Sequence, residues 1–181
     1  NLFSFYFILF LMLLQGFVGW YMVKSGLVDR IDVSQYRLSL HLTLAIIIFC
    51  ILFWNYLKNI SQNNFESNVK ISFYLPVIFL IILILQISLG AFVSGLDAGQ
   101  IYQSWPLMNQ NYFPDDSMFG DLFSLKVFET PSLAQFIHRN VAYILLVFFL
   151  VILFIVFKND DLVYLRKSAI LVFLFLLLQL F

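Results

Sequence analysis

The chain has 181 residues, of which 62% are hydrophobic and only 11% are charged. A soluble domain of this size needs more charge on its surface, so the composition excludes an ordinary soluble protein. The formal net charge of zero argues against a nucleic-acid partner. The composition therefore predicts a polytopic membrane protein.

Apolar runs long enough to cross a hydrocarbon core as helices recur along the chain. In chain order, the predicted spans are residues 2–23, 35–57, 71–93, 130–157 and 168–181. The last run ends after 14 residues, which is too short to cross, and the chain begins with Asn1 rather than Met. We therefore expect a piece of a longer all-α transmembrane helix bundle, cut at both ends.

The connections divide this chain and supply its polar surface. An Asn-rich linker at 58–70 separates residues 1–57 from residues 71–181. Residues 94–129 form the longest polar stretch, and a loop of this length is more often functional than a bare tether. Within it, the sequence predicts an interfacial helix from Phe119 to Phe128.

The distribution of basic residues predicts how the spans are oriented. Five lie on the face of the Asn-rich linker, namely Lys58, Lys70, Lys158, Arg166 and Lys167. Three remain on the other face once Arg37 and Arg139, which lie within predicted helices, are set aside. Because basic loops stay in the cytoplasm, this excess places the Asn-rich linker inside and the opposite helix ends outside the cytoplasm.

The only two histidines, His41 and His138, occupy matched positions near the start of the second and fourth spans. Ser34 and Thr130 are predicted N-caps, and the histidines follow them by seven and eight residues. At 1.5 Å per residue, each histidine lies on the order of 10 Å inside its helix start. Two imidazoles are therefore expected at similar depth, on the outer side of the membrane.

A short internal repeat accompanies the histidines. Gln15 precedes Gly19 by four residues at the end of the first span, and Gln86 precedes Gly90 in the same way at the end of the third. A buried amide followed by a glycine suits close contact between helices. The pattern of a Gln-x-x-x-Gly helix, a polar connection and a histidine helix occurs twice, and a repeat of this kind favours a site between its copies. Chance similarity between two short matches is the alternative.

A histidine within a span is costly unless it is paired, lines a cavity or binds a ligand. Haem fits these residues best, because it needs one or two axial ligands and otherwise an apolar slot. Arg37 lies one helical turn before His41 on the same face, where a guanidinium could meet haem propionates; Arg139 directly follows His138. The alternative is that both histidines pack against the buried Gln amides while the arginines reach the lipid headgroups.

Several long strings resemble one known family. They are residues 19–27 (GWYMVKSGL), 33–42 (VSQYRLSLHL), 90–99 (GAFVSGLDAG), 102–108 (YQSWPLM) and 127–139 (VFETPSLAQFIHR). In order and spacing they resemble haem A synthases of the alphaproteobacterial and mitochondrial type. That family has eight spans in two four-helix halves, and this chain resembles the third to the seventh.

The resemblance implies the domains and the reaction. Residues 1–57 would form the last two helices of the N-terminal half, residues 58–70 a linker on the cytoplasmic side, and residues 71–181 the first part of the C-terminal half, with a long outer loop at 94–129. The implied reaction oxidises a methyl group of haem O to a formyl group and yields haem A for cytochrome oxidase. This is an oxidoreductase acting on a CH group.

The resemblance also implies the site. His41 and His138 would each ligate a haem iron, with Arg37 and Arg139 as further cofactor-binding residues. The implied cofactor is haem b, with haem O as substrate and haem A as product. The partner histidines and the family's catalytic acid fall on spans that this chain does not match. No catalytic side chain can therefore be named, and the piece alone is expected to be inactive.

The implied surroundings are a bacterial inner (plasma) membrane, or a mitochondrial inner membrane if the source is eukaryotic. Expected partners are haem O, haem O synthase, cytochrome oxidase assembly factors and the lipid bilayer; a homo-oligomer is compatible with the sequence. Two alternatives stay open. One is a di-haem membrane cytochrome that passes electrons without modifying haem, and the other is a membrane scaffold without haem.

Overall fold

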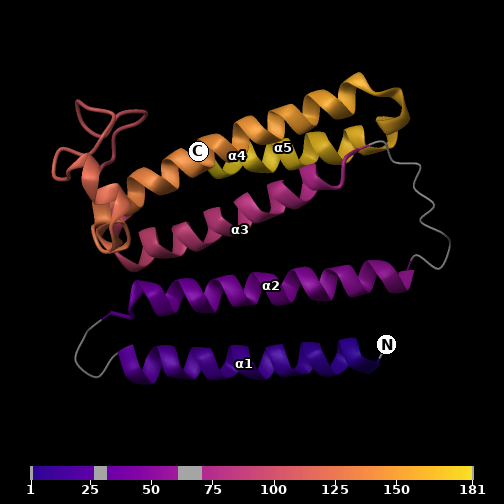
Figure 1. Cartoon of the computed structure of the whole chain (residues 1–181), viewed down its shortest axis with the longest axis horizontal. Helices are drawn as coiled ribbons and strands as arrows, with labels where there is room; N and C mark the ends of the chain where they lie inside the picture. The colour runs from indigo at the N-terminus through magenta and orange to yellow at the C-terminus, as the bar shows by residue number, and fades with distance from the viewer. Residues whose placement is uncertain (1, 27–31, 61–70, 181) are drawn as a thin grey trace. The chain divides into compact units, whose positions relative to one another are not determined.

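The computed structural model describes residues 2–26, 32–60 and 71–180, and within these ranges its regular elements are all helices. The α-helices are α1 (Leu2–Gly26), α2 (Gln35–Ile60), α3 (Tyr74–Gly95), α4 (Pro131–Lys158) and α5 (Arg166–Leu180), as labelled in Figure 1. The short 3-10 helices are η1 (Ala98–Gln100), η2 (Phe119–Phe123), η3 (Leu125–Phe128) and η4 (Asp160–Leu165). The predicted all-α class is confirmed.

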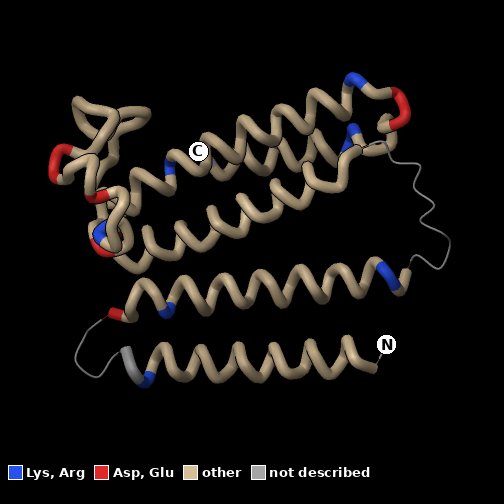
Figure 2. The backbone as a smooth tube through the Cα atoms, in the orientation of Figure 1, with Lys and Arg blue, Asp and Glu red and all other residues tan. Residues whose placement is uncertain are grey.

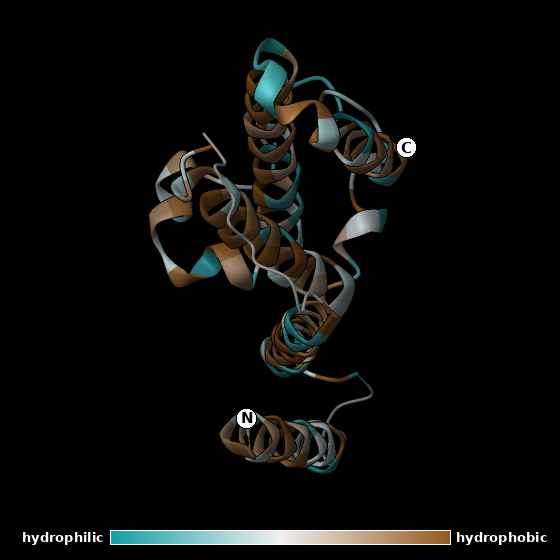
Figure 3. Ribbon diagram, turned by 90° about the vertical axis from the view of Figure 1, so that its right-hand side faces the viewer, coloured by the Kyte–Doolittle hydropathy of each residue, from teal (hydrophilic) through white to brown (hydrophobic). Residues whose placement is uncertain are grey.

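Helices α1 to α4 are long and apolar enough to cross a membrane. Even α3, with 22 residues, is about 33 Å long, which exceeds a hydrocarbon core of about 30 Å. Only 6% to 17% of the residues in their most apolar windows are buried, so most of their apolar surface is exposed, and the hydrophobic colour predominates along the helix ribbons (Figure 3). Lipid can solvate these faces, and the charged residues gather near the helix ends and in the connections (Figure 2).

The helices belong to two compact units. The first contains α1, α2, the last part of α3 from Ile87 and the chain as far as His138. The second contains the first part of α3, the remainder of α4 from Arg139, and α5. Both predicted histidines therefore lie in the first unit.

Polar contacts and a glycine join α2 to α3 within the first unit. The Ser39 hydroxyl donates to the backbone carbonyl of Ser88 at 3.1 Å, and the Thr43 and Ser88 hydroxyls lie 2.7 Å apart. Gly95, the last residue of α3, lies so close to α2 that a Cβ atom there would fall 2.8 Å from the Cα of Gln35. Small and hydroxyl-bearing residues are the usual means by which membrane helices approach closely.

The loop between α3 and α4 folds onto the helix ends of the first unit. Phe92 of α3 packs against Tyr36 of α2 and Phe128 of η3, with ring centroids 5.3 and 5.0 Å apart. The Gln35 amide donates to the Phe128 carbonyl at 3.4 Å. In the middle of the loop, Met108 is 1% exposed and is fully packed. The long polar stretch is therefore a built structure with its own core.

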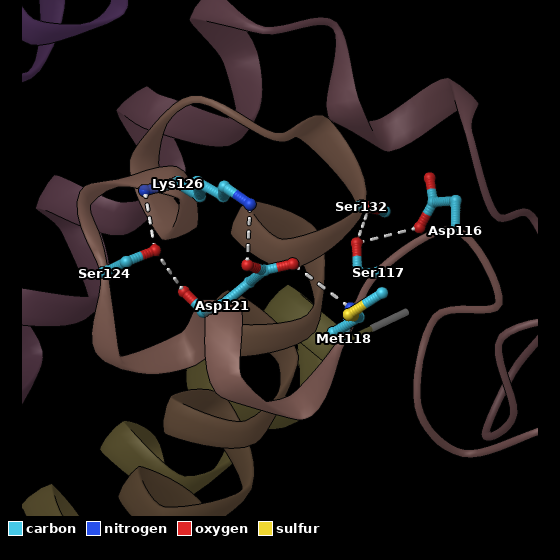
Figure 4. A network of polar contacts seen from close by, with 7 residues as sticks. All are labelled: Asp116, Ser117, Met118, Asp121, Ser124, Lys126 and Ser132. Carbon is cyan, nitrogen blue, oxygen red and sulfur yellow. Dashed lines mark hydrogen bonds and ion pairs between the residues drawn. The ribbon is translucent and has the colours of Figure 1, made fainter.

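A polar network holds η2 and η3 together (Figure 4). The Lys126 ammonium donates to Asp121 Oδ1 at 2.9 Å, and the Met118 backbone N–H donates to Asp121 Oδ2 at 3.2 Å. The Ser124 hydroxyl donates to the Asp121 carbonyl at 2.9 Å. The network fixes a turn at Ser124, where the first 3-10 helix ends and the second begins.

The second unit has an apolar groove of about 560 Å³. Its lining includes Pro76 at the start of α3, Phe149 of α4 and Val172 of α5. Arg166 closes the turn between α4 and α5, because its guanidinium donates to the Phe157 carbonyl at 3.0 Å and to Asp160 at 3.1 Å.

The predicted spans agree with the helices to within a few residues at each end, and the helix starts after Ser34 and Thr130 are as expected. The single interfacial helix expected over Phe119–Phe128 is wrong in form, since the structure has two short 3-10 helices there. The reason is local, because Ser124 adopts an extended backbone conformation and its hydroxyl accepts from the Lys126 N–H. The predicted division into domains stays a prediction, and most of its linker lies outside the described residues.

Candidate functional site

His41 lies in the second turn of α2 and faces α1. Its imidazole rests directly against Gly19, where a Cβ atom would fall 3.0 Å from the ring carbon Cε1. The amide nitrogen of Gln15, one turn earlier on α1, lies 3.3 Å from His41 Nε2 and 3.1 Å from the His41 carbonyl oxygen. The two residues of the first Gln-x-x-x-Gly segment therefore both contact the same histidine.

These contacts orient the Gln15 amide toward His41. The His41 carbonyl can only accept, so the Gln15 atom beside it must be the –NH₂ group. The same –NH₂ group lies beside Nε2 and can only donate to it. An imidazole nitrogen that carries no proton is the form that ligates a metal, and the Gln15 –NH₂ group can donate to such a nitrogen.

Two other polar atoms at this contact are buried without a hydrogen-bond partner, His41 Nδ1 and Gln15 Oε1. A buried polar atom without a partner costs on the order of 1–3 kcal/mol. Proteins rarely tolerate this cost without a functional reason. The imidazole with a buried ring nitrogen that has no partner thus fits a haem ligand.

His138 lies in the second turn of α4 and faces α3. Its Cε1 atom would lie 3.2 Å from a Cβ atom at Gly90, so this imidazole also rests against a glycine. The preceding turn is buried under the loop. Gln135 donates to the Tyr102 carbonyl at 2.9 Å, and the Ser132 hydroxyl lies 3.2 Å from that of Ser117. The loop therefore covers the N-terminal end of α4 beside this histidine.

The structure assigns the two histidines to different helix pairs, His41 to α1 and α2 and His138 to α3 and α4. Whether each pair forms a haem site of its own stays a prediction. Among the described residues, no group of three or more His, Cys, Asp or Glu side chains could hold a metal ion.

The predicted arginines differ in their surroundings. Arg37, one turn before His41 on α2, places its guanidinium over the ring of Tyr21 of α1 at 5.0 Å. This cation–π contact holds the charge beside the C-terminal end of α1 and the N-terminal end of α2. Arg139 follows His138 in α4 and is half-buried. Their role toward a cofactor stays a prediction.

The sequence showed Gln15 and Gly19 as part of a repeat but could not identify their partner. Their contact with His41 depends on how α1 packs against α2. The same holds for Thr43 and Ser88, whose hydroxyls meet across α2 and α3. An isolated hydroxyl in an apolar run gives no signal for which helix it will face.

Comparisons with known proteins relate the chain to one protein family. The model of the COX15-CtaA family, described as cytochrome oxidase assembly protein, matches residues 3–181. A haem A synthase of Pelagibacter ubique is 50% identical over 157 residues, which cover 87% of this chain and 46% of that protein. A haem A synthase of Rickettsia bellii (strain RML369-C) is 40% identical over 185 residues, covering 99% of this chain and 54% of that protein.

A haem A synthase of a Wolbachia endosymbiont of Brugia malayi is 45% identical over 137 residues, or 74% of this chain and 41% of that protein. The chain thus spans about half the length of the curated relatives that it matches. No solved structure matches the chain significantly.

Proposed function

The chain belongs to the COX15-CtaA cytochrome oxidase assembly family, and we propose that the protein containing it is a haem A synthase, which oxidises a methyl group of haem O to the formyl group of haem A. Relatives with that name, 40% to 50% identical to the chain, support the proposal. The observation that carries it is structural. Each of the two histidines lies at a similar depth in a spanning helix, with its ring against a glycine of the preceding helix.

We propose that His41 and His138 each ligate the iron of a haem and that the resident cofactor is haem b. An iron porphyrin supplies the redox chemistry that carbon oxidation needs. For this role the chain provides two imidazoles, each within a predominantly apolar helix. Gln15 would give up its contact with Nε2 when that nitrogen ligates iron and would keep its bond to the His41 carbonyl.

The arginines complete the proposed sites. A guanidinium suits a carboxylate because it offers several N–H donors in a fixed plane. Arg37 lies one turn nearer the outer face than His41, so propionates of a haem bound at His41 could turn toward it. We assign Arg139 the corresponding part at His138. Neither residue is proposed to act on the methyl group.

Activity is proposed for the full-length protein and not for the described chain alone. Each haem needs a second axial ligand and the reaction needs a catalytic side chain, and we place these in the remainder of the protein. We further propose an inner-membrane location, with haem O synthase and cytochrome oxidase assembly factors as partners.

The test is to express the full-length gene in a bacterial host together with a haem O synthase and to analyse the extracted haems by chromatography and mass spectrometry. We expect a haem bearing a formyl group, absent from the same host with haem O synthase alone. A folded, haem-loaded protein without any formyl-bearing haem would contradict the proposal and would favour a di-haem cytochrome.

A further inference from the structure

Four glycines of the described chain allow a comparison of what a methyl group would meet at each. In α1, a Cβ atom added to Gly16 would have nothing within 4 Å, whereas one added to Gly19 would meet the His41 ring at 3.0 Å. In α3, a Cβ atom at Gly90 would meet the His138 ring at 3.2 Å, and one at Gly95 would meet the Cα of Gln35 at 2.8 Å. Gly19 and Gly90 thus share a property that the other two lack, since their nearest neighbour is an imidazole.

The contact is with the same atom in both cases. A Cβ atom at Gly19 would lie 3.0 Å from Cε1, 3.6 Å from Nδ1 and 3.7 Å from Nε2 of His41. At Gly90 the corresponding distances to His138 are 3.2, 3.8 and 3.9 Å. Each ring therefore turns its Cε1 edge to the bare backbone of the neighbouring helix. A distance of 3.0–3.4 Å is tighter than most real Cβ contacts, so an added methyl group would push the ring by a few tenths of an ångström.

We propose that Gly19 and Gly90 are positioning residues that set the orientation of His41 and His138 toward the haem irons. The inference rests on the proposed function, because it assumes that these histidines are ligands. Groups that orient a metal-ligating histidine affect metal affinity by about 10- to 100-fold when they are changed. Here the orienting feature is the absence of a side chain at glycine. A methyl group added at this position would tilt the imidazole ring.

Helix propensity alone predicts that replacing a glycine by alanine stabilises the protein, whereas the contact with the imidazole predicts weaker haem binding. The two effects have opposite signs, so an experiment can separate them. Glycine within a helix is normally less favourable than alanine. Gly16→Ala should therefore leave the protein unchanged or make it more stable. Gly19→Ala gains the same helix propensity in the same helix. A loss of haem binding or stability in Gly19→Ala, but not in Gly16→Ala, would therefore be due to the contact with His41.

The experiment uses the full-length protein, purified with its haem, and compares wild type with Gly16→Ala, Gly19→Ala and Gly90→Ala. The readouts are haem content, the electron paramagnetic resonance g-values of the low-spin haems and their midpoint potentials. We expect Gly19→Ala and Gly90→Ala each to change the signal of a different haem and to weaken its binding by about 10-fold. We expect Gly16→Ala to match wild type.

Unchanged g-values and potentials in Gly19→Ala and Gly90→Ala would overturn the proposal. If Gly19→Ala does not fold, the double variant Gly19→Ala/His41→Ala decides, because the ring that the methyl group meets is then gone. Recovery of folding in the double variant supports the contact. Failure of the double variant to fold while His41→Ala alone folds overturns it. The proposed function is judged separately on wild type, by its formyl-bearing haem.

Discussion

At the scale of single residues, His41 and His138 have the same local arrangement in two different helix pairs. Each ring lies in the second turn of its helix with its Cε1 edge against a glycine. At His41 the Gln15 amide nitrogen also lies 3.3 Å from Nε2 and 3.1 Å from the carbonyl oxygen. An imidazole whose orientation is restricted by its neighbours loses less conformational freedom when it binds a ligand.

Replacement of His138 by alanine tests the assignment of a haem to α4. We expect His138→Ala in the full-length protein to remove one bis-histidine low-spin haem signal, because the imidazole that ligates the iron is lost. The measurement is the optical and electron paramagnetic resonance spectrum, with haem content per protein. His41→Ala is the matched control and should remove the other signal. An unchanged low-spin spectrum in His138→Ala would refute the assignment.

At the scale of elements, hydroxyl groups and a glycine bring α2 and α3 together. Ser39 and Thr43 both reach Ser88, one through its backbone carbonyl and the other through its hydroxyl. Lipid is as apolar as the helix surfaces, so the hydrophobic effect does not favour one helix partner over another. These polar contacts therefore contribute to the choice of partner.

A double-mutant cycle on Thr43→Val and Ser88→Ala tests this contact. We expect a coupling of about 0.6 kcal/mol, and no more than about 1.7 kcal/mol, as for other hydrogen bonds between membrane helices. The measurement is reversible unfolding in detergent. Ser94→Ala, an exposed serine of α3, serves as the control and should show no coupling with Thr43→Val. Zero coupling between Thr43 and Ser88 would contradict the contact.

The turn between η2 and η3 predicts a pH effect. The Lys126 ammonium and then the Met118 N–H, both donating to Asp121, hold the pKa of this carboxyl below its ordinary value of 3.8. The stabilisation is therefore fully present above pH 3.8 and is lost as the pH falls through the lower folded-state pKa. We expect Lys126→Met to raise the pKa of Asp121, as followed by carboxyl ¹³C resonances during titration. Lys158→Met, a lysine remote in sequence, should leave it unchanged, and an unchanged pKa in Lys126→Met would contradict the contact.

The sequence was sufficient to predict the helices but not how they pair. Runs such as Leu2–Gly26 are apolar on all sides, so length and composition define the helix while periodicity does not identify its buried face. For the same reason Gln15 and Gly19 could be recognised as a motif, but their contact with His41 required the packing of α1 on α2. The turn at Ser124 was missed because its hydroxyl competes locally with a continuous helix.

At the scale of the whole molecule, the loop between α3 and α4 and the two histidines lie toward the same helix ends. The polar loop between α3 and α4 covers the helix ends near both histidines of the first unit, through Gln35 and Gln135. The basic residues are in excess at the opposite helix ends. We propose that the haem sites lie near this loop with their propionates toward it, on the face that the basic residues predict to be outside the cytoplasm.

The orientation can be tested by labelling single cysteines in the full-length protein after its native cysteines, Cys50 included, have been replaced. Gln110→Cys lies in the loop between α3 and α4, and Val163→Cys lies in η4, and both positions are exposed. Because the excess of basic residues predicts that the η4 side is cytoplasmic, a membrane-impermeant maleimide should label Gln110→Cys in spheroplasts and leave Val163→Cys unlabelled. Detergent should make both reactive, which controls for accessibility. Labelling of Val163→Cys alone before detergent would reverse the orientation and would place the proposed haem sites near the cytoplasmic face.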